Sequence, residues 1–253
     1  MTTASRERFI IFNADDLGMS SGINRGIFAA HEHGIVTSAS LMVRWSAASE
    51  AANYARLHPD MSTGLHLDMG EWVCRANQWT SRYQVVPHDA TADQYADETR
   101  RQIDRFHSLM GRTPSHLDSH QHCHRSHPLR EITIEICKDL RIPLRELASP
   151  ARYVGSFYGQ ASNGESYPGC VSTESLIAFF DRLPEGITEF GCHPAATVDF
   201  DSTYAAERVL ELQTLCDPAV RAAIEARSLR LISFREIPLE SIVTAHGNLK
   251  AEF

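Results

Sequence analysis

Short apolar runs alternate along the chain with longer segments in which apolar residues recur every three or four positions. The short runs are rich in β-branched residues and predict strands, whereas the longer spacing is typical of helices that bury one face. We expect seven strands, at residues 9–13, 38–43, 62–67, 115–119, 143–147, 188–192 and 231–234. This alternation predicts a parallel sheet, because each crossover between parallel strands needs a connection of helical length.

Helix-boundary residues support this reading. Ser20 or Ser21 can cap a helix that stops at Gly34, and Pro128 falls in the first turn of another helix. No glycine-rich dinucleotide loop follows the first strand, so we expect an α/β fold with a closed or nearly closed (β/α) barrel, in one domain over residues 1–253. Two long connections, 68–90 and 151–169, should lie over the carboxyl ends of the strands, where barrel active sites form.

The composition narrows the classes of partner. The net charge is −8 and lysines and arginines do not cluster, which argues against nucleic acid. No apolar run is long enough to span a membrane, and the first eight residues lack a signal-peptide core, so we expect a cytoplasmic protein. The six cysteines form no C-x-x-C pair and should be reduced. The unusual count is thirteen histidines, five of them between His116 and His127.

Two adjacent carboxylates, Asp15 and Asp16, follow the first strand. Their mutual repulsion makes the pair costly unless a cation lies beside it. One carboxylate could bind a divalent metal ion while the other stays free as a general base. The alternative is a turn or helix-cap pair, since aspartate favours both positions.

The segment from His116 to His124 is the strongest chemical signal in the chain. If it is extended, its even positions share one face and bring four histidines together with Asp118. Burying so many titratable groups without a metal or an acid–base task is expensive. A solvated histidine-rich loop is the alternative.

Three further residues complete the candidate site. His66 lies between two leucines near a strand end, where a histidine is either a satisfied core residue or a ligand. With Asp16 and His120 it would form a site of mixed nitrogen and oxygen donors with one open position, which is the catalytic pattern. His193 precedes a proline, which favours extended backbone and suits a positioned acid or a surface turn. Arg145 could hold a site carboxylate ionised or form a peripheral salt bridge.

These motifs, in this order, resemble the YdjC/ChbG family of carbohydrate deacetylases, including its hopanoid-associated (HpnK-like) members. The likeness spans nearly the whole chain. The matching segments are Asn13-Ala14-Asp15-Asp16-Leu17-Gly18, Gly64-Leu65-His66, His116 through His124, Leu144-Arg145 and Cys192-His193-Pro194. The resemblance implies a (β/α) barrel, seven-stranded and related to polysaccharide deacetylase and glycoside hydrolase barrels.

The resemblance also implies roles for these residues. One divalent metal ion would be held by Asp16, His66 and His120, with Asp15 as the general base and His193 as the acid. The implied reaction is hydrolysis of the C–N bond of an N-acetyl group on a small carbohydrate or glycolipid. Family members are described with Mg2+ and related deacetylases with Zn2+. The imidazole ligands favour Zn2+ or another borderline metal, so the metal's identity stays open.

Aromatic residues in the two long connections are candidates for stacking on a pyranose ring, although each could equally be local packing. Trp72 is the first choice because it follows the third strand, and His122 is a further candidate contact. The aromatic candidates are Trp72, Trp79, Tyr83, Phe157 and Tyr158. The 68–90 connection does not align with chito-oligosaccharide-specific members, so the substrate stays open. A homodimer also stays open.

Three other classes of function remain. A metal-dependent phosphoesterase would need arginine, lysine or a glycine-rich turn for phosphate, and only Arg145 and Arg75 offer that. A non-catalytic carbohydrate-binding barrel is disfavoured because every candidate catalytic and metal residue is present. A structural-metal protein would instead require a closed sphere of four ligands.

Overall fold

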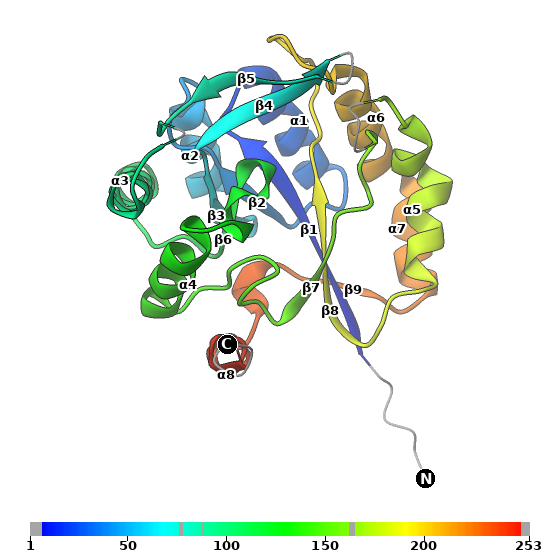
Figure 1. Ribbon diagram of the computed structural model, residues 1–253. Helices are drawn as coiled ribbons and strands as arrows, with labels where there is room; N and C mark the ends of the chain where they lie inside the picture. Colours follow the sequence, from blue (N-terminus) through cyan, green and yellow to red (C-terminus); the bar gives the residue numbers. More distant parts are fainter. Residues whose placement is uncertain (1–6, 76–77, 88, 162–164, 249–253) are drawn as a thin grey trace.

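A curled parallel sheet lies at the centre of the computed structural model, and helices cover its outer face (Figure 1). The structure describes residues 7–75, 78–87, 89–161 and 165–248. The seven strands are β1 (Arg8–Leu17), β2 (Ser38–Leu41), β3 (Ser62–Leu67), β6 (Leu117–Ser119), β7 (Ala151–Val154), β8 (Gly186–Cys192) and β9 (Arg230–Leu231). Their order is β6-β3-β2-β1-β8-β7, with β9 beside β1. The predicted α/β architecture with a parallel sheet is therefore confirmed.

The helices begin and end at the expected kinds of residue. Ser20 caps the first helix by accepting from the Ile23 N–H, and Thr91 with Gln94 forms a capping box at the start of the longest one. The helices are α1 (Ser21–Glu32), α2 (Ala48–Leu57), α3 (Ala92–Met110), α4 (Leu129–Leu140), α5 (Thr173–Phe180), α6 (Ala205–Leu215), α7 (Pro218–Ala226) and α8 (Leu239–Asn248). None of the helices in the described ranges is long and apolar enough to cross a membrane.

The side chains of strand β1 alternate between the two faces of the sheet, and the inner face changes from apolar at Ile11 to polar at Asn13. Ile10, Phe12 and Ala14 belong to the main hydrophobic core under the helices, where Phe12 stacks on another phenylalanine at 5.0 Å. The odd positions turn to the inner side of the sheet, where Asn13 donates a hydrogen bond to Asp15 at 2.8 Å. Because side chains alternate along a strand, the run that buries its even residues carries Asp15 into the interior.

The predicted closed barrel is not found, because the edge strands β6 and β7 form no ladder in the described ranges. The strand predicted at 143–147 is wrong. Its backbone makes one parallel bridge, from Leu144 to Leu117, and then folds back on Ala148. Glu146 turns the chain there with φ 63°. The edge strand is instead β7, within the connection predicted to be irregular, and the sheet stays an open curl.

The other long connection also contains regular structure. Strands β4 (Gly70–Arg75) and β5 (Gln78–Gln84) form an antiparallel hairpin that is a separate two-stranded sheet. Figure 1 shows this hairpin lying across the carboxyl end of the central sheet. The last predicted strand is shorter than expected: β9 pairs with Phe9 and Ile10 of β1. A 3-10 turn, η3 (Phe234–Glu236), follows it.

Candidate active site

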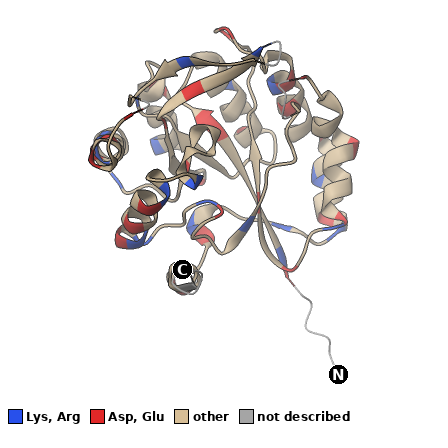
Figure 2. Cartoon of the chain, in the orientation of Figure 1, with Lys and Arg blue, Asp and Glu red and all other residues tan. Residues whose placement is uncertain are grey.

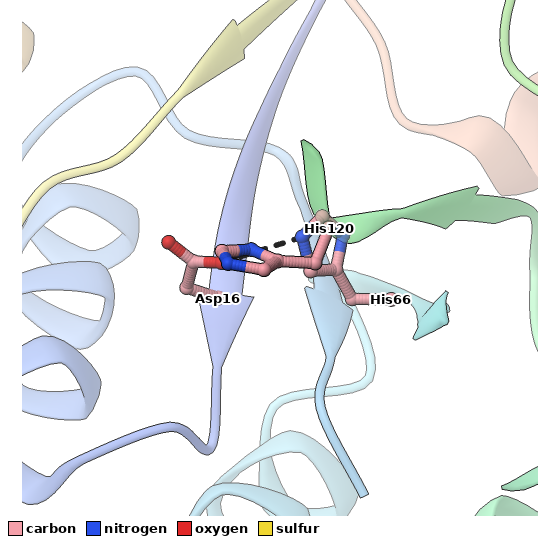
Figure 3. Close-up of side chains that lie close together, drawn as sticks. All are labelled: Asp16, His66 and His120. Atoms are coloured by element: carbon pink, nitrogen blue, oxygen red, sulfur yellow. Dashed lines mark hydrogen bonds and ion pairs between the residues drawn. The ribbon is translucent and has the colours of Figure 1, made fainter. Parts of the chain in front are cut away.

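The three candidate metal ligands meet at the carboxyl end of the sheet. Asp16 is in β1, His66 is in β3, and His120 directly follows β6. Asp16 Oδ1 lies 3.3 Å from His66 Nε2 and 3.0 Å from His120 Nδ1 (Figure 3). One ligand atom from each residue lies within 4.8 Å of the others. Figure 2 shows the acidic end of β1 in the interior, beneath the hairpin.

The extended part of the histidine-rich run ends at Ser119, the last residue of β6. A 3-10 turn, η1 (His120–Arg125), follows β6, and within it Gln121 and His122 have φ of 51° and 53°. This turn breaks the two-residue alternation, so the predicted single face of even positions is wrong. His116 stacks on an aromatic ring inside the sheet, with 3.8 Å between ring centroids.

Two of the candidate ligands, His66 and Asp16, are oriented by a further partner. The His66 Nδ1–H donates to Asp118 Oδ1 at 2.8 Å, and the second oxygen of Asp16 accepts from Arg208 at 2.5 Å. Carboxylates that accept from one imidazole nitrogen fix the ring and leave the other nitrogen for a metal. Burial would raise the pKa of Asp16, but Arg208 and His120 hold it well below its usual range.

Arg145 is fully buried and binds three carboxylates beneath the site. Its Nη1 and Nη2 donate to the two oxygens of Asp15 at 2.7 and 2.8 Å, and its Nε donates to Glu189 at 2.7 Å. Nη2 also lies 2.7 Å from Asp118. Burial would raise the pKa of Asp15 and of Asp118, but Arg145 and His66 together outweigh it and lower both. Arg145 thus touches carboxylates and does not line the cavity above, a position that suits its predicted part in holding a site carboxylate ionised.

Among the described residues, the three carboxylates nearest the ligand atoms carry one charge more than the arginines that pair with them. The three ionised carboxylates Asp15, Asp16 and Asp118 face two guanidinium groups, those of Arg145 and Arg208. A cation between the ligand atoms would balance this charge.

His66 responds to the same surplus of negative charge. Burial opposes its protonation, but Asp118 and Asp15 outweigh burial and raise the pKa of His66 to about 10. Its proton therefore stands where a metal cation would bind. The Nε2 atom of His120 is buried without a hydrogen-bond partner in the described part of the chain. The charge balance, this free nitrogen and the mixed donor set all fit a divalent metal ion.

Two other groups of potential ligands are already satisfied. His124 contacts the Ser119 hydroxyl at 2.6 Å and the Arg145 carbonyl at 3.2 Å, and Glu146 accepts from Arg125 at 2.5 Å. This leaves the cluster of His122, His124 and Glu146 with few free donor atoms. The cluster of Asp15, His66 and Asp118 is neutralised by the guanidinium described above.

His193 lies on the other side of Asp15, with 3.8 Å between His193 Nε2 and Asp15 Oδ2. Burial lowers the pKa of His193 to about 4, despite the nearby carboxylates, so the imidazole is neutral at pH 7. Its backbone N–H donates to Glu211, which also accepts from the Tyr204 hydroxyl at 2.7 Å. Burial raises the pKa of Glu211 to about 8. Asp15, the candidate base, and His193, the candidate acid, therefore lie next to each other.

Helix α6 supplies site residues that the sequence reading missed. Tyr204 lies next to its start, and Arg208 and Glu211 are buried within it. Charged residues at such spacing are typical of a solvated helix face, so the pattern suggested exposure. The one available signal is the spacing of 204, 208 and 211, which places an aromatic ring and two opposite charges on one side of a helix.

A cavity of about 370 Å³ opens above these residues, and four of the six candidate substrate contacts present surface to it: Trp72, Trp79, His122 and Tyr158. Tyr83 does not line it, and its hydroxyl donates to Asp68 at 3.0 Å. Trp72, which is 40% exposed, and the partly buried His122 and Tyr158 line its walls. Phe157 borders the cavity but is fully buried in the main core, so its ring supports the wall and offers no face to a sugar.

Glu189 gives a test of the buried charge network. Burial, partly opposed by Arg145, raises its pKa from 4.5 to about 7. Its stabilising effect is therefore complete below pH 4.5 and is lost as the pH rises to about 7. We expect wild type to lose about 3 kcal/mol relative to Glu189→Gln between pH 4.5 and pH 8, measured by urea denaturation. An equal difference at both pH values would contradict the shift, and the exposed Glu135→Gln is the control.

Comparisons with known proteins identify the family of this chain. The model of the YdjC-like protein family matches residues 9–226. A carbohydrate deacetylase of Geobacillus stearothermophilus is 32% identical, over 90% of this chain and 98% of that protein. A chitooligosaccharide deacetylase of Serratia marcescens is 29% identical, over 91% of this chain and all of that protein.

Solved structures share the fold at low sequence identity. A protein of Enterococcus faecalis V583, described as a candidate cellobiose-phosphate cleavage protein, has a TM-score of 0.75 and 23% identity, covering 92% of this chain and 99% of that one. A family 4 carbohydrate esterase from Streptomyces lividans has a TM-score of 0.52 and 14% identity, covering 90% and 94%. From the family match over most of its length, together with these relatives, the chain belongs to the YdjC-like protein family.

Proposed function

We propose that this protein is a carbohydrate deacetylase that hydrolyses the N-acetyl group of a small carbohydrate or glycolipid with one divalent metal ion. The observation that carries the proposal is the difference in surroundings between two adjacent carboxylates. Asp16 faces the pair His66 and His120, while Asp15 faces His193. The names of the deacetylase relatives support the reaction class.

The proposed metal would be held by Asp16, His66 and His120. When bound, a divalent ion polarises an acetyl carbonyl and lowers the pKa of a water molecule toward ~7. Two nitrogen donors suit Zn2+ better than Mg2+, so we favour Zn2+ while both remain candidates.

Asp15 is the proposed general base. Arg145 binds both of its oxygens, which fixes the plane of the carboxylate and keeps it ionised before the reaction. In this position it takes the proton from the attacking water, a role that is worth about a hundred- to ten-thousand-fold in rate.

His193 is the proposed acid. At rest it is neutral, because burial keeps its pKa near 4. Asp15 Oδ2 lies 3.8 Å from His193 Nε2, so a proton taken up by this oxygen can pass to the imidazole and on to the departing amine. One proton then serves both halves of the reaction, and acetate and an amino sugar are released.

A phosphoesterase is less well supported. Among the described residues that line the cavity, Arg208 is the one arginine or lysine, and it is already paired with Asp16. A phosphate group would therefore meet no free cation other than the metal.

Acetate release tests the proposal directly. We expect release from at least one member of a panel of N-acetylated monosaccharides, oligosaccharides and glycolipids. Chelation should abolish acetate release, and adding back Zn2+ or Mg2+ should restore it. The reason is that attack on the acetyl carbonyl requires a water molecule activated by the metal. Unchanged release after chelation would contradict metal dependence, and no release from any substrate would favour a carbohydrate-binding protein.

A further inference from the structure

Tyr153, the third residue of β7, lies in a narrow slot at the edge of the active-site cavity. Its ring lies between two glycines, and a side chain at either of them would collide with it. A Cβ atom on Gly155 would lie 2.9 Å from Tyr153 Cε1, and one on Gly191 would lie 2.7 Å from the Tyr153 hydroxyl oxygen. The two glycines therefore allow the phenol to approach the backbone closely on both sides.

Two further side chains fix the ring of Tyr153. The guanidinium carbon of Arg145 lies over its face, 4.7 Å from the ring centroid. The His122 ring meets it in an edge-to-face arrangement, with 5.4 Å between the centroids. Arg145 is itself held by three buried carboxylates, so the surface beneath the phenol is rigid. A ring packed in this way keeps its hydroxyl in one place before any ligand binds.

The hydroxyl of Tyr153 has no hydrogen-bond partner within the described part of the chain, and its oxygen is open to solvent. Burial raises the pKa of Tyr153 well above its usual range, although Arg145 opposes this effect. The group is therefore an uncharged phenol at neutral pH and can donate a hydrogen bond. A fixed donor with no partner, at the edge of a cavity, is available to a ligand.

The register of the strands places this donor beside the proposed base and acid. Gly191, which lies against the hydroxyl, pairs with Asn13 on β1, two residues before Asp15. His193 follows Gly191 by two residues on the neighbouring strand. Since positions two residues apart share a face of the sheet, the hydroxyl lies on the same inner side as the base and the acid. The acetyl group must lie on this side during hydrolysis.

We propose that the Tyr153 hydroxyl is a further catalytic group, which donates a hydrogen bond to the carbonyl oxygen of the reacting acetyl group. This oxygen gains negative charge when water attacks, so a fixed donor stabilises the transition state more than it stabilises the uncharged amide. The hydroxyl keeps its proton, and the proton transfers through Asp15 and His193 are unchanged. This inference rests on the proposed function, because the oxyanion arises only when an acyl group is hydrolysed.

Tyr153→Phe tests the donor, because it removes the hydroxyl and keeps the ring over Arg145. We expect kcat for the best N-acetylated substrate of the panel to fall about a hundred-fold, with KM and metal content unchanged. The loss should be smaller for the same sugar with an N-trifluoroacetyl group, since fluorine withdraws charge from the oxyanion and makes it a weaker acceptor. Tyr167→Phe, at an exposed tyrosine outside the cavity, is the matched control and should change neither substrate.

The outcome separates the donor from the reaction. A higher KM with an unchanged kcat, or equal losses for the acetyl and trifluoroacetyl substrates, overturns the proposal while deacetylation stands. If wild type releases no acetate, calorimetric titration of the Zn2+-loaded protein with sodium acetate still decides, because the acetate oxygens carry negative charge as the oxyanion does. A Kd for acetate raised about ten-fold in Tyr153→Phe, with Tyr167→Phe unchanged, then supports the donor although the proposed function fails. An unchanged Kd overturns the donor.

Discussion

Asp15→Asn is expected to lower kcat by about a hundred- to ten-thousand-fold while the protein keeps its metal. The amide cannot accept a proton from water at neutral pH, yet it leaves Asp16, His66 and His120 in place. Single-turnover acetate release and metal content by elemental analysis of the same sample measure the two effects separately.

The matched control is the neighbouring carboxylate. Asp16→Asn should lose metal and activity together, because it removes the charged oxygen that lies between His66 and His120. Near-normal turnover of Asp15→Asn with metal bound would show that another group is the base. Full metal content in Asp16→Asn would place the metal elsewhere.

Arg145→Met is expected to destabilise the folded protein by about 3–5 kcal/mol. The substitution leaves Asp15, Asp118 and Glu189 buried without their shared guanidinium. The cost is that of stranding buried charge, so it should be smaller at pH 4 than at pH 8, where the carboxyl groups cannot easily take up protons. Urea denaturation at the two pH values measures this difference.

The exposed Arg100→Met is the control for Arg145, because Arg100 pairs with Asp97 on the solvent side of α3 and should have no measurable effect. A loss below about 1 kcal/mol for Arg145→Met at pH 8 would mean that water reaches the carboxylates.

Some of the site follows from the chain's pattern alone. Apolar strands that end in Asp15 and Asp16, in His66 and near His120 had to bring these residues together, because parallel strands end on the same edge of a sheet. The rest depends on tertiary contacts. Arg145 follows a strand-like run, but this run makes a single parallel bridge, at Leu144, before the chain turns. The Arg145 side chain then reaches the buried carboxylates.

The site residues of α6 have a pattern in the sequence that is typical of exposure, but they are buried in the structure. The charges of α6 are typical of an exposed face, and they are buried because Arg208 finds Asp16 and Glu211 finds Tyr204. Arg208 and Asp16 are 192 residues apart in the sequence, so local spacing cannot reveal that they pair. The single domain, the cytoplasmic location and the homodimer stay predictions.

The separation of the β4–β5 hairpin from the central sheet has a consequence for how this family can diversify. Its strands pair with each other between Gly70 and Gln84 and, in the described ranges, with none of the strands that carry the carboxylates and histidines. Under the proposed function, substrate choice and bond cleavage would depend on separate sheets, which could change separately during evolution. A hairpin exchanged between relatives could redirect such an enzyme to another sugar with its hydrolytic centre intact.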